Sequence, residues 1–150
     1  MTAMSIKYIL AVDPGKRNGL AIFQDEKDGL LQCNWAATVE GLIDYLHGAM
    51  QRMSLSVIVA EDFIIAPGKN NGSRGEAMQV IGILKFAAKL FDIPLVLQRP
   101  ELRLHAAKWA GETIPKGHMP DEQSARLHGI YYMRSQGKFT TVLEREKHGV

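Results

Sequence analysis

The sequence predicts a single α/β domain in which a mixed sheet of five strands is covered by helices on both faces. Three observations support this fold class. Three apolar runs separated by turn signals open the chain, and helical patterns then alternate with short apolar strands. A length of 150 residues with 46% hydrophobic residues suffices for one buried core. With no internal repeat and no interdomain linker, we expect one domain over residues 1–150.

The opening runs predict three antiparallel strands. Residues 6–13 are β-branched and apolar enough for a strand that is buried on both faces near its end. Pro14-Gly15 interrupts the pairing, and apolar residues resume at 20–23. The polar segment 25–29 has the composition of a hairpin turn, and it precedes a third run at 30–37.

A helix and a fourth strand are expected next. Thr38 can cap a helix in which apolar residues recur at spacings of three and four up to Met53. The short run 55–60 is continuously apolar and indicates a buried strand. This strand would deliver Glu61 and Asp62 at its end, where the backbone direction is fixed.

The second half of the chain alternates helices with one short strand. After a loop rich in glycine and asparagine, Ser73 and Glu76 have capping-box spacing for a helix that runs to about Phe91. The following elements are a strand at 94–97, a short helix from Arg99 through Trp109, a linker at 111–117 and a last helix at 120–135. Beyond Gly137 the pattern decays, and we expect this tail to be flexible or to act as an arm.

Three acidic residues fall at element ends that can converge. Asp13 ends the first strand, Glu61 ends the fourth, and Asp121 lies in the first turn of the last helix. Neighbouring parallel strands would bring the first two to one sheet edge, where α/β folds place their sites. Carboxylate oxygens suit Mg²⁺ or Mn²⁺, and such a group can hold two ions about 3.5 to 4 Å apart. The pattern favours metal-dependent phosphodiester hydrolysis.

His118 precedes Asp121 by three residues, a spacing that allows both side chains to bind one ion. An imidazole ligand would favour Mn²⁺, while a capping or surface role for this histidine stays open. Asp62 and Glu122 are expected to face away from their acidic neighbours.

The net charge of +2 does not by itself indicate a nucleic-acid partner. Basic residues do gather in the segments 66–75 and 99–117, although an ordinary solvated surface would account for them equally well. The candidates for contacts with DNA are Lys69, Arg74, Arg99, Arg103, Lys108 and Lys116. A single cysteine, Cys33, excludes an intrachain disulfide, and with no signal-peptide pattern we expect a cytoplasmic protein without a membrane segment.

Three segments carry a family resemblance. The run Ile9-Leu-Ala-Val-Asp13-Pro-Gly-Lys-Arg-Asn-Gly19-Leu-Ala-Ile resembles the first strand and turn of RuvC-like Holliday junction resolvases, in the ribonuclease H-like superfamily, and particularly the short bacteriophage versions. Val57-Ile-Val-Ala-Glu61 is similar to the family's second acidic strand, and His118-Met-Pro-Asp121-Glu-Gln-Ser-Ala125 to its final helix.

The resemblance implies a ribonuclease H-like fold and a specific activity. Asp13, Glu61, His118 and Asp121 would be the metal-binding catalytic residues, with two Mg²⁺ ions per site and Mn²⁺ also accepted. The protein would be a homodimer that cuts four-way DNA junctions symmetrically, and a phage-encoded version would act in the cytoplasm of a bacterial host. The chain is shorter than cellular resolvases and its loop after Glu61 is unusual, which leaves the range of branched substrates open.

Three other interpretations remain. A YqgF-like nuclease acting on RNA has the same opening strand, but the Asp-Glu-Arg signature of that group does not follow Glu61. An actin-like phosphate-binding module shares the glycine spacing after Asp13 but normally needs two such domains. A catalytically silent DNA-binding relative would not need the intact acidic set.

Overall fold

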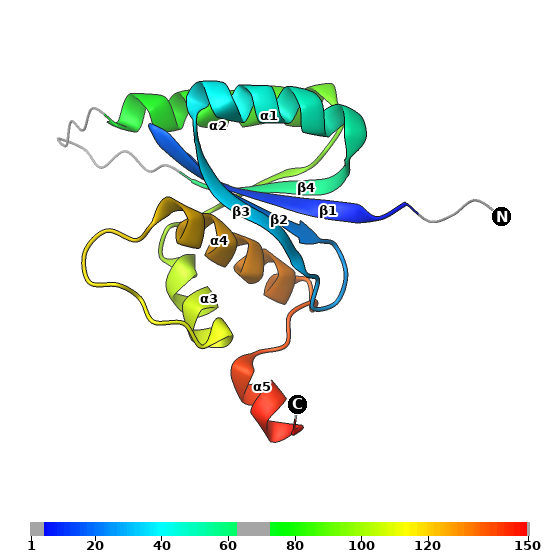
Figure 1. Cartoon of the computed structure of the whole chain (residues 1–150), viewed down its shortest axis with the longest axis vertical. Helices are drawn as coiled ribbons and strands as arrows, with labels where there is room; N and C mark the ends of the chain where they lie inside the picture. The colour runs from blue at the N-terminus through cyan, green and yellow to red at the C-terminus, as the bar shows by residue number, and fades with distance from the viewer. Residues whose placement is uncertain (1–4, 63–72, 150) are drawn as a thin grey trace.

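The structure, a computed structural model, describes residues 5–62 and 73–149. One sheet lies between two helical layers, α1 with α2 on one face and α3 with α4 on the other, and α5 extends beyond the second layer (Figure 1). The elements in chain order are β1 (Lys7–Asp13), β2 (Arg17–Gln24), β3 (Leu31–Thr38), α1 (Val39–Arg52), β4 (Ser54–Glu61), α2 (Ser73–Leu90), β5 (Leu95–Gln98), α3 (Leu102–Ala110), α4 (Asp121–Ser135) and α5 (Val142–Lys147).

The sheet has the order β3-β2-β1-β4-β5. Strands β1, β2 and β3 pair antiparallel, whereas β4 joins β1 in parallel and β5 joins β4 in parallel. The predicted mixed five-stranded sheet with helices on both faces is therefore confirmed. Because β1 and β4 are parallel neighbours, their carboxyl ends lie at the same edge.

Alternating side chains of β1 enter two separate hydrophobic cores. Leu10 and Val12 pack into the core under α1 and α2, while Ile9 and Ala11 pack into the core under α3 and α4. All four side chains are fully buried. A strand that must be apolar on both faces explains the continuous hydrophobic run in the sequence.

Helix α1 begins where the sequence predicted. The backbone N–H of Gly41 donates to the Thr38 hydroxyl oxygen at 3.1 Å, so Thr38 is the N-cap. Helix α3 begins at Leu102, three residues later than predicted, because residues 99–101 form a turn in which the N–H of Leu102 reaches the carbonyl of Arg99 at 3.2 Å. None of the described helices is long and apolar enough to span a membrane.

Helix α4 lies close to β2 at Gly129. A Cβ atom added to Gly129 would lie 2.3 Å from Cε2 of Phe23 on β2, a separation that side chains do not tolerate. Glycine at this position therefore leaves room for the Phe23 ring between α4 and β2.

The segment after Gly137, for which the sequence indicated no element, contains helix α5. Thr141 and Glu144 form a capping box at its start. The preceding residues are tied to the β2–β3 hairpin, since Lys138 Nζ lies 2.6 Å from Asp25 Oδ1 and the Thr140 hydroxyl donates to Asp28 at 2.8 Å. Long-range contacts of this kind do not leave a local sequence pattern.

Candidate active site

One cavity of about 560 Å³ opens at the carboxyl ends of β1 and β4, beside the start of α4. All four residues predicted as metal ligands line it, namely Asp13, Glu61, His118 and Asp121. The structure thus brings together side chains that lie up to 108 positions apart (121 minus 13) in the chain.

Asp13 is held at the end of β1 by the turn that follows it. Asn18, fully buried, accepts a hydrogen bond from the N–H of Gly15 at 3.0 Å and donates to the carbonyl of Ala37 at 3.3 Å. These bonds close the Pro14-Gly15 turn and attach it to β3. Asp13 lines the cavity but is only 8% exposed, so its carboxyl group is largely removed from solvent.

The environment of Asp13 strongly favours its protonated form. Burial, followed by the negative charge of Glu61, raises the pKa of Asp13 to about 8 from an ordinary value of 3.8. The negative charge of Asp121 also raises the pKa of Asp13, whereas a hydrogen bond with Ser124 lowers it. Asp13 is also hydrogen-bonded to Glu61, and the two pKa values are shifted in opposite directions.

The pKa of Glu61 is shifted in the opposite direction. Burial by itself would raise its pKa, but a hydrogen bond from His128 and the positive charge of Arg103 outweigh burial and lower the pKa of Glu61 below its usual value. His128 Nε2 lies 3.1 Å from Glu61 Oε1, and Arg103 Nε lies 3.3 Å from the same oxygen. Glu61 is thus the ionised member of the Asp13–Glu61 pair.

Sequence reasoning missed the buried partners of Glu61. His128 is fully buried, and its Nδ1 lies 2.8 Å from Oε1 of Gln98, the last residue of β5. A signal was present, because Asp121, Ser124 and His128 follow the helical spacing i, i+3, i+7 and so share one face of α4. A polar stripe on the buried face of a helix indicates a site.

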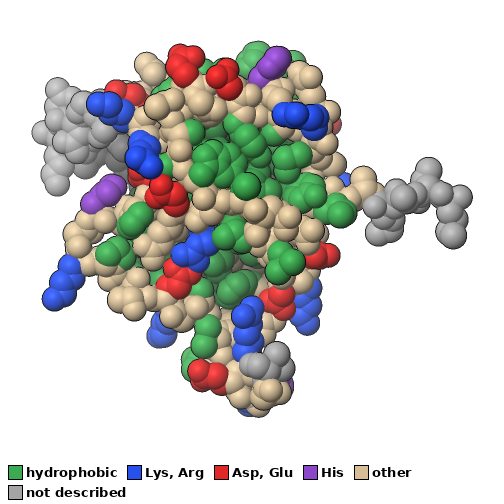
Figure 2. All heavy atoms as spheres, in the orientation of Figure 1, with side chains coloured by type: hydrophobic (Ala, Val, Ile, Leu, Met, Phe, Trp, Pro, Cys, Tyr) green, Lys and Arg blue, Asp and Glu red, His purple; other side chains and the backbone are tan. Residues whose placement is uncertain are grey.

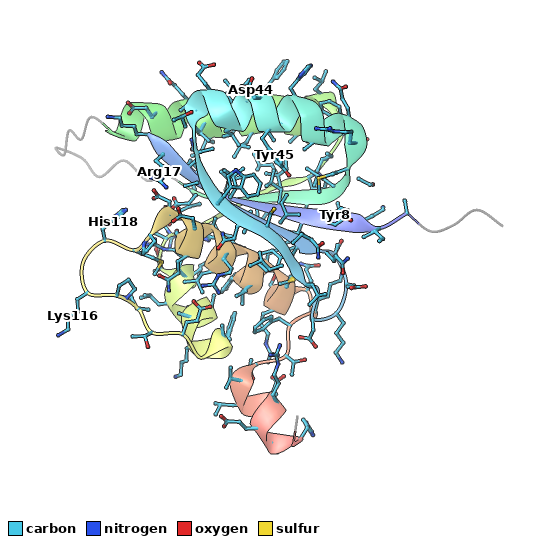
Figure 3. All side chains as sticks on the ribbon, in the orientation of Figure 1. Tyr8, Arg17, Asp44, Tyr45, Lys116 and His118 are labelled. Atoms are coloured by element: carbon cyan, nitrogen blue, oxygen red, sulfur yellow. The ribbon has the colours of Figure 1, made fainter. Side chains whose placement is uncertain are left out.

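His118 and Asp121 lie together at the start of α4. His118 Nε2 is 3.7 Å from Asp121 Oδ1, and the His118 side chain is 87% exposed whereas that of Asp121 is 24% exposed. Figure 3 shows His118 and Lys116 on the long loop that precedes α4. Glu122, which forms an ion pair with Arg17 at 3.3 Å, is not among the residues that line the cavity.

The donor chemistry of this cavity fits a hard divalent cation, although the described residues do not form a preformed coordination group. Within residues 5–62 and 73–149, no three His, Cys, Asp or Glu side chains are arranged to hold an ion. Instead, Asp13 forms a hydrogen bond with Glu61. Glu61 in turn contacts His128 and forms an ion pair with Arg103. Burial is the main cause of the raised pKa of Asp13, and the negative charge of Glu61, the second cause, is what a bound cation would offset.

The basic residues that were predicted to contact DNA do not all lie at the cavity. Arg103 lies inside the cavity wall, where it donates to the Pro100 carbonyl at 2.8 Å and to the Ser124 hydroxyl at 3.1 Å. Arg99 pairs with Glu101 at 3.7 Å, while Lys108 and Lys116 are exposed. Lys69 and the side chain of Arg74 lie outside the described residues.

Two further basic residues were not singled out from the sequence. Lys16 and Arg17 are exposed and line the cavity directly after Asp13. On the face seen in Figure 2, blue and red side chains are interspersed. The positive groups relevant to an anionic ligand are therefore those at the cavity rim rather than a wide basic face on this side.

Comparisons with known proteins identify the fold. No family model matches the chain, and no curated protein matches it. Among solved structures, that of T. thermophilus RuvC in complex with Holliday junction substrate aligns with a TM-score of 0.64 and 12% identity, over 91% of this chain and 99% of that one. A second structure, of Thermus thermophilus RuvC, aligns with a TM-score of 0.57 and 12% identity, over 90% and 99%. The chain therefore has a ribonuclease H-like fold, as found in RuvC.

Proposed function

We propose that this protein is a divalent-metal-dependent endonuclease that cuts branched DNA, chiefly four-way junctions. The observation that carries the proposal is the meeting of Asp13, Glu61, Asp121 and His118 around one cavity of a RuvC-like fold. The RuvC of T. thermophilus with this fold has been solved with a Holliday junction substrate, which supports the choice of substrate class.

The four cavity residues would hold the metal. Asp13, Glu61 and Asp121 supply hard oxygen ligands suited to Mg²⁺, and His118 supplies an imidazole that tolerates Mn²⁺. When bound, a pair of such ions activates the attacking water and stabilises the leaving oxygen. A carboxyl group acts as a metal ligand in its deprotonated form, so the raised pKa of Asp13 would couple metal binding to the release of a proton.

Basic side chains at the rim would bind the DNA backbone. Lys16, Arg17 and the exposed Lys116 lie around the cavity or on the loop that leads to it, and they can contact phosphates without reading bases. Lys108 and Arg99 extend this set along α3 and the turn before it. Lys69 and Arg74 are included from the sequence alone.

A homodimer is part of the proposal because two symmetric cuts require two copies of the site. Light scattering of the protein with a bound four-way junction should give the mass of two chains per junction. A single chain per junction at working concentration would count against junction resolution.

The deciding experiment compares labelled substrates. A four-way junction, fork, flap, linear duplex, single-stranded DNA and RNA are each incubated with Mg²⁺, Mn²⁺ or chelator, using wild-type protein and Asp13→Asn. Paired cuts in the junction that need metal and vanish in Asp13→Asn support the proposal. Cleavage of RNA alone would instead favour the YqgF-like activity.

A catalytically silent junction-binding protein is the second candidate. It is favoured by the contacts of Arg103 and His128 with Oε1 of Glu61, which already occupy this carboxylate oxygen in the metal-free site. The same panel separates the two candidates, because a silent protein would bind the junction in chelator and cut none of the substrates in either metal.

A further inference from the structure

We infer that His128, held in place by Gln98, is a positioning residue that orients the Glu61 carboxylate toward the metal. This inference rests on the proposed function. Three elements meet at this point, since Glu61 ends β4, Gln98 ends β5 and His128 comes from α4. Glu61 and Gln98 are register partners in the sheet, and His128 bridges their side chains at 3.1 Å and 2.8 Å.

The imidazole ring of His128 has a fixed orientation. It is fully buried in α4, next in sequence to the core residue Leu127, and both ring nitrogens have partners. When Nε2 donates to Glu61, the amide of Gln98 can satisfy Nδ1 in either protonation state of the ring, because an amide offers both an acceptor and a donor. Gln98 is itself only 5% exposed, so this amide is also confined.

Two of the contacts on Glu61 fall on the same oxygen atom. His128 Nε2 and Arg103 Nε both approach Oε1, at 3.1 Å and 3.3 Å. A carboxylate pinned through one oxygen presents the other in a defined direction, which is how outer partners orient a metal ligand. Removing the contact at Oε1 would let Glu61 rotate within the cavity and lower the affinity for a cation.

His128 and Arg103 differ in what they can reach. The Arg103 side chain is 25% exposed and lines the cavity, so it can meet a phosphate directly. The His128 side chain has no exposed surface, and it can influence the reaction only through Glu61. For this reason we assign His128 to positioning and not to substrate binding.

The test uses the 150-residue chain, three variants at the site and one control variant. His128→Leu removes the donor at similar size, His128→Gln keeps an amide donor toward Glu61, and Gln98→Leu removes only the outer partner. Met133→Leu, in the same helix and buried in the same core, is the control for packing. Folding is followed by circular dichroism and thermal unfolding in chelator, and Mn²⁺ binding by calorimetry without DNA.

Removing a residue that hydrogen-bonds a metal ligand typically weakens metal affinity about 10- to 100-fold. We expect a weakening of this order for His128→Leu. His128→Gln should restore much of the affinity, and Gln98→Leu should show a smaller loss. The Mg²⁺ concentration for half-maximal junction cleavage should rise in parallel, with partial recovery at saturating metal. Met133→Leu should leave metal binding unchanged, whatever its melting temperature.

A failure of the positioning role and a failure of the proposed function would give different results. A folded His128→Leu protein with wild-type Mn²⁺ affinity would overturn the positioning role. Where His128→Leu does not fold, Gln98→Leu decides, and wild-type affinity in that variant overturns the role in the same way. If the wild-type protein itself binds no Mn²⁺, the proposed function fails, and the positioning role fails with it.

Discussion

Gly19 on β2 lies directly against the first residue of α4, so closely that a Cβ atom on Gly19 would be 1.9 Å from the carbonyl oxygen of Asp121. Gly19 is also the register partner of Asp13 on β1. This one glycine therefore brings the two acidic residues together, since any side chain at position 19 would push the start of α4 away from the sheet.

The first prediction concerns this contact. Gly19→Ala should destabilise the protein by about 1 to 3 kcal/mol, the usual cost of overpacking, and should reduce cleavage further by displacing Asp121. Denaturant unfolding and junction cleavage measure the two effects. Gly82→Ala on the exposed side of α2 is the matched control, because no atom lies within 4 Å of the added Cβ. A Gly19→Ala protein as stable and active as Gly82→Ala would contradict the packing argument.

The second prediction concerns the pH dependence of stability at Asp13. Its folded-state pKa of about 8 lies above the ordinary value of 3.8. The stabilising effect of the protonated group is thus complete below about pH 4 and is lost as the pH rises through 8. Metal-free Asp13→Asn, which cannot ionise, should melt above the wild-type protein at pH 8, and this difference should shrink toward pH 5.

Thermal unfolding in chelator across this pH range checks the prediction, with about 2 to 4 °C expected per kcal/mol in a domain of this size. Asp44→Asn is the control, since Asp44 is an exposed acid on α1, away from the cavity (Figure 3). We also expect Asp13→Asn to bind junctions but not to cleave them. Retained cleavage, or identical pH profiles for wild type and variant, would remove Asp13 from the proposed centre.

The third prediction concerns His118. Its exposed side chain lies beside Asp121, so His118→Asp should remain active while its metal preference moves from Mn²⁺ toward Mg²⁺, because a carboxylate is a harder ligand than imidazole. Cleavage rates across a concentration series of each metal measure the shift. His47→Asp on the exposed side of α1 is the control. An unchanged Mg²⁺/Mn²⁺ ratio would assign His118 to a surface or capping role.

The fourth prediction concerns Lys116 on the loop before α4. Lys116→Gln should weaken junction binding and reduce the slope of log affinity against log salt by about 0.9, the value for one lost phosphate contact on duplex DNA. Fluorescence titrations at several salt concentrations measure this slope. Lys85→Gln, on the exposed side of α2 in the opposite helical layer, should leave it unchanged. Equal slopes for both variants would exclude Lys116 from the DNA contact.

Several features were determined by the sequence alone because their causes are local. Each of three features depends on a few neighbouring residues: the strand β1, which is apolar on both faces, the N-cap of α1 at Thr38, and the position of Glu61 at the end of β4. Periodicity and capping act over one or two turns of chain, so they can be interpreted without coordinates. The same local signals placed Asp13, Glu61 and Asp121 at element ends.

The tertiary structure decided how those ends meet. The contact of Glu61 with His128 spans 67 positions and depends on how α4 packs on the sheet, which Gly19 and Gly129 permit through close approach. The protonation of Asp13 likewise follows from burial and from the charge of Glu61. Such effects arise only when segments that are distant in the sequence pack together and bury a group away from water. The position of Asp13 beside the Pro14-Gly15 turn could therefore be predicted from the sequence, but its pKa could not.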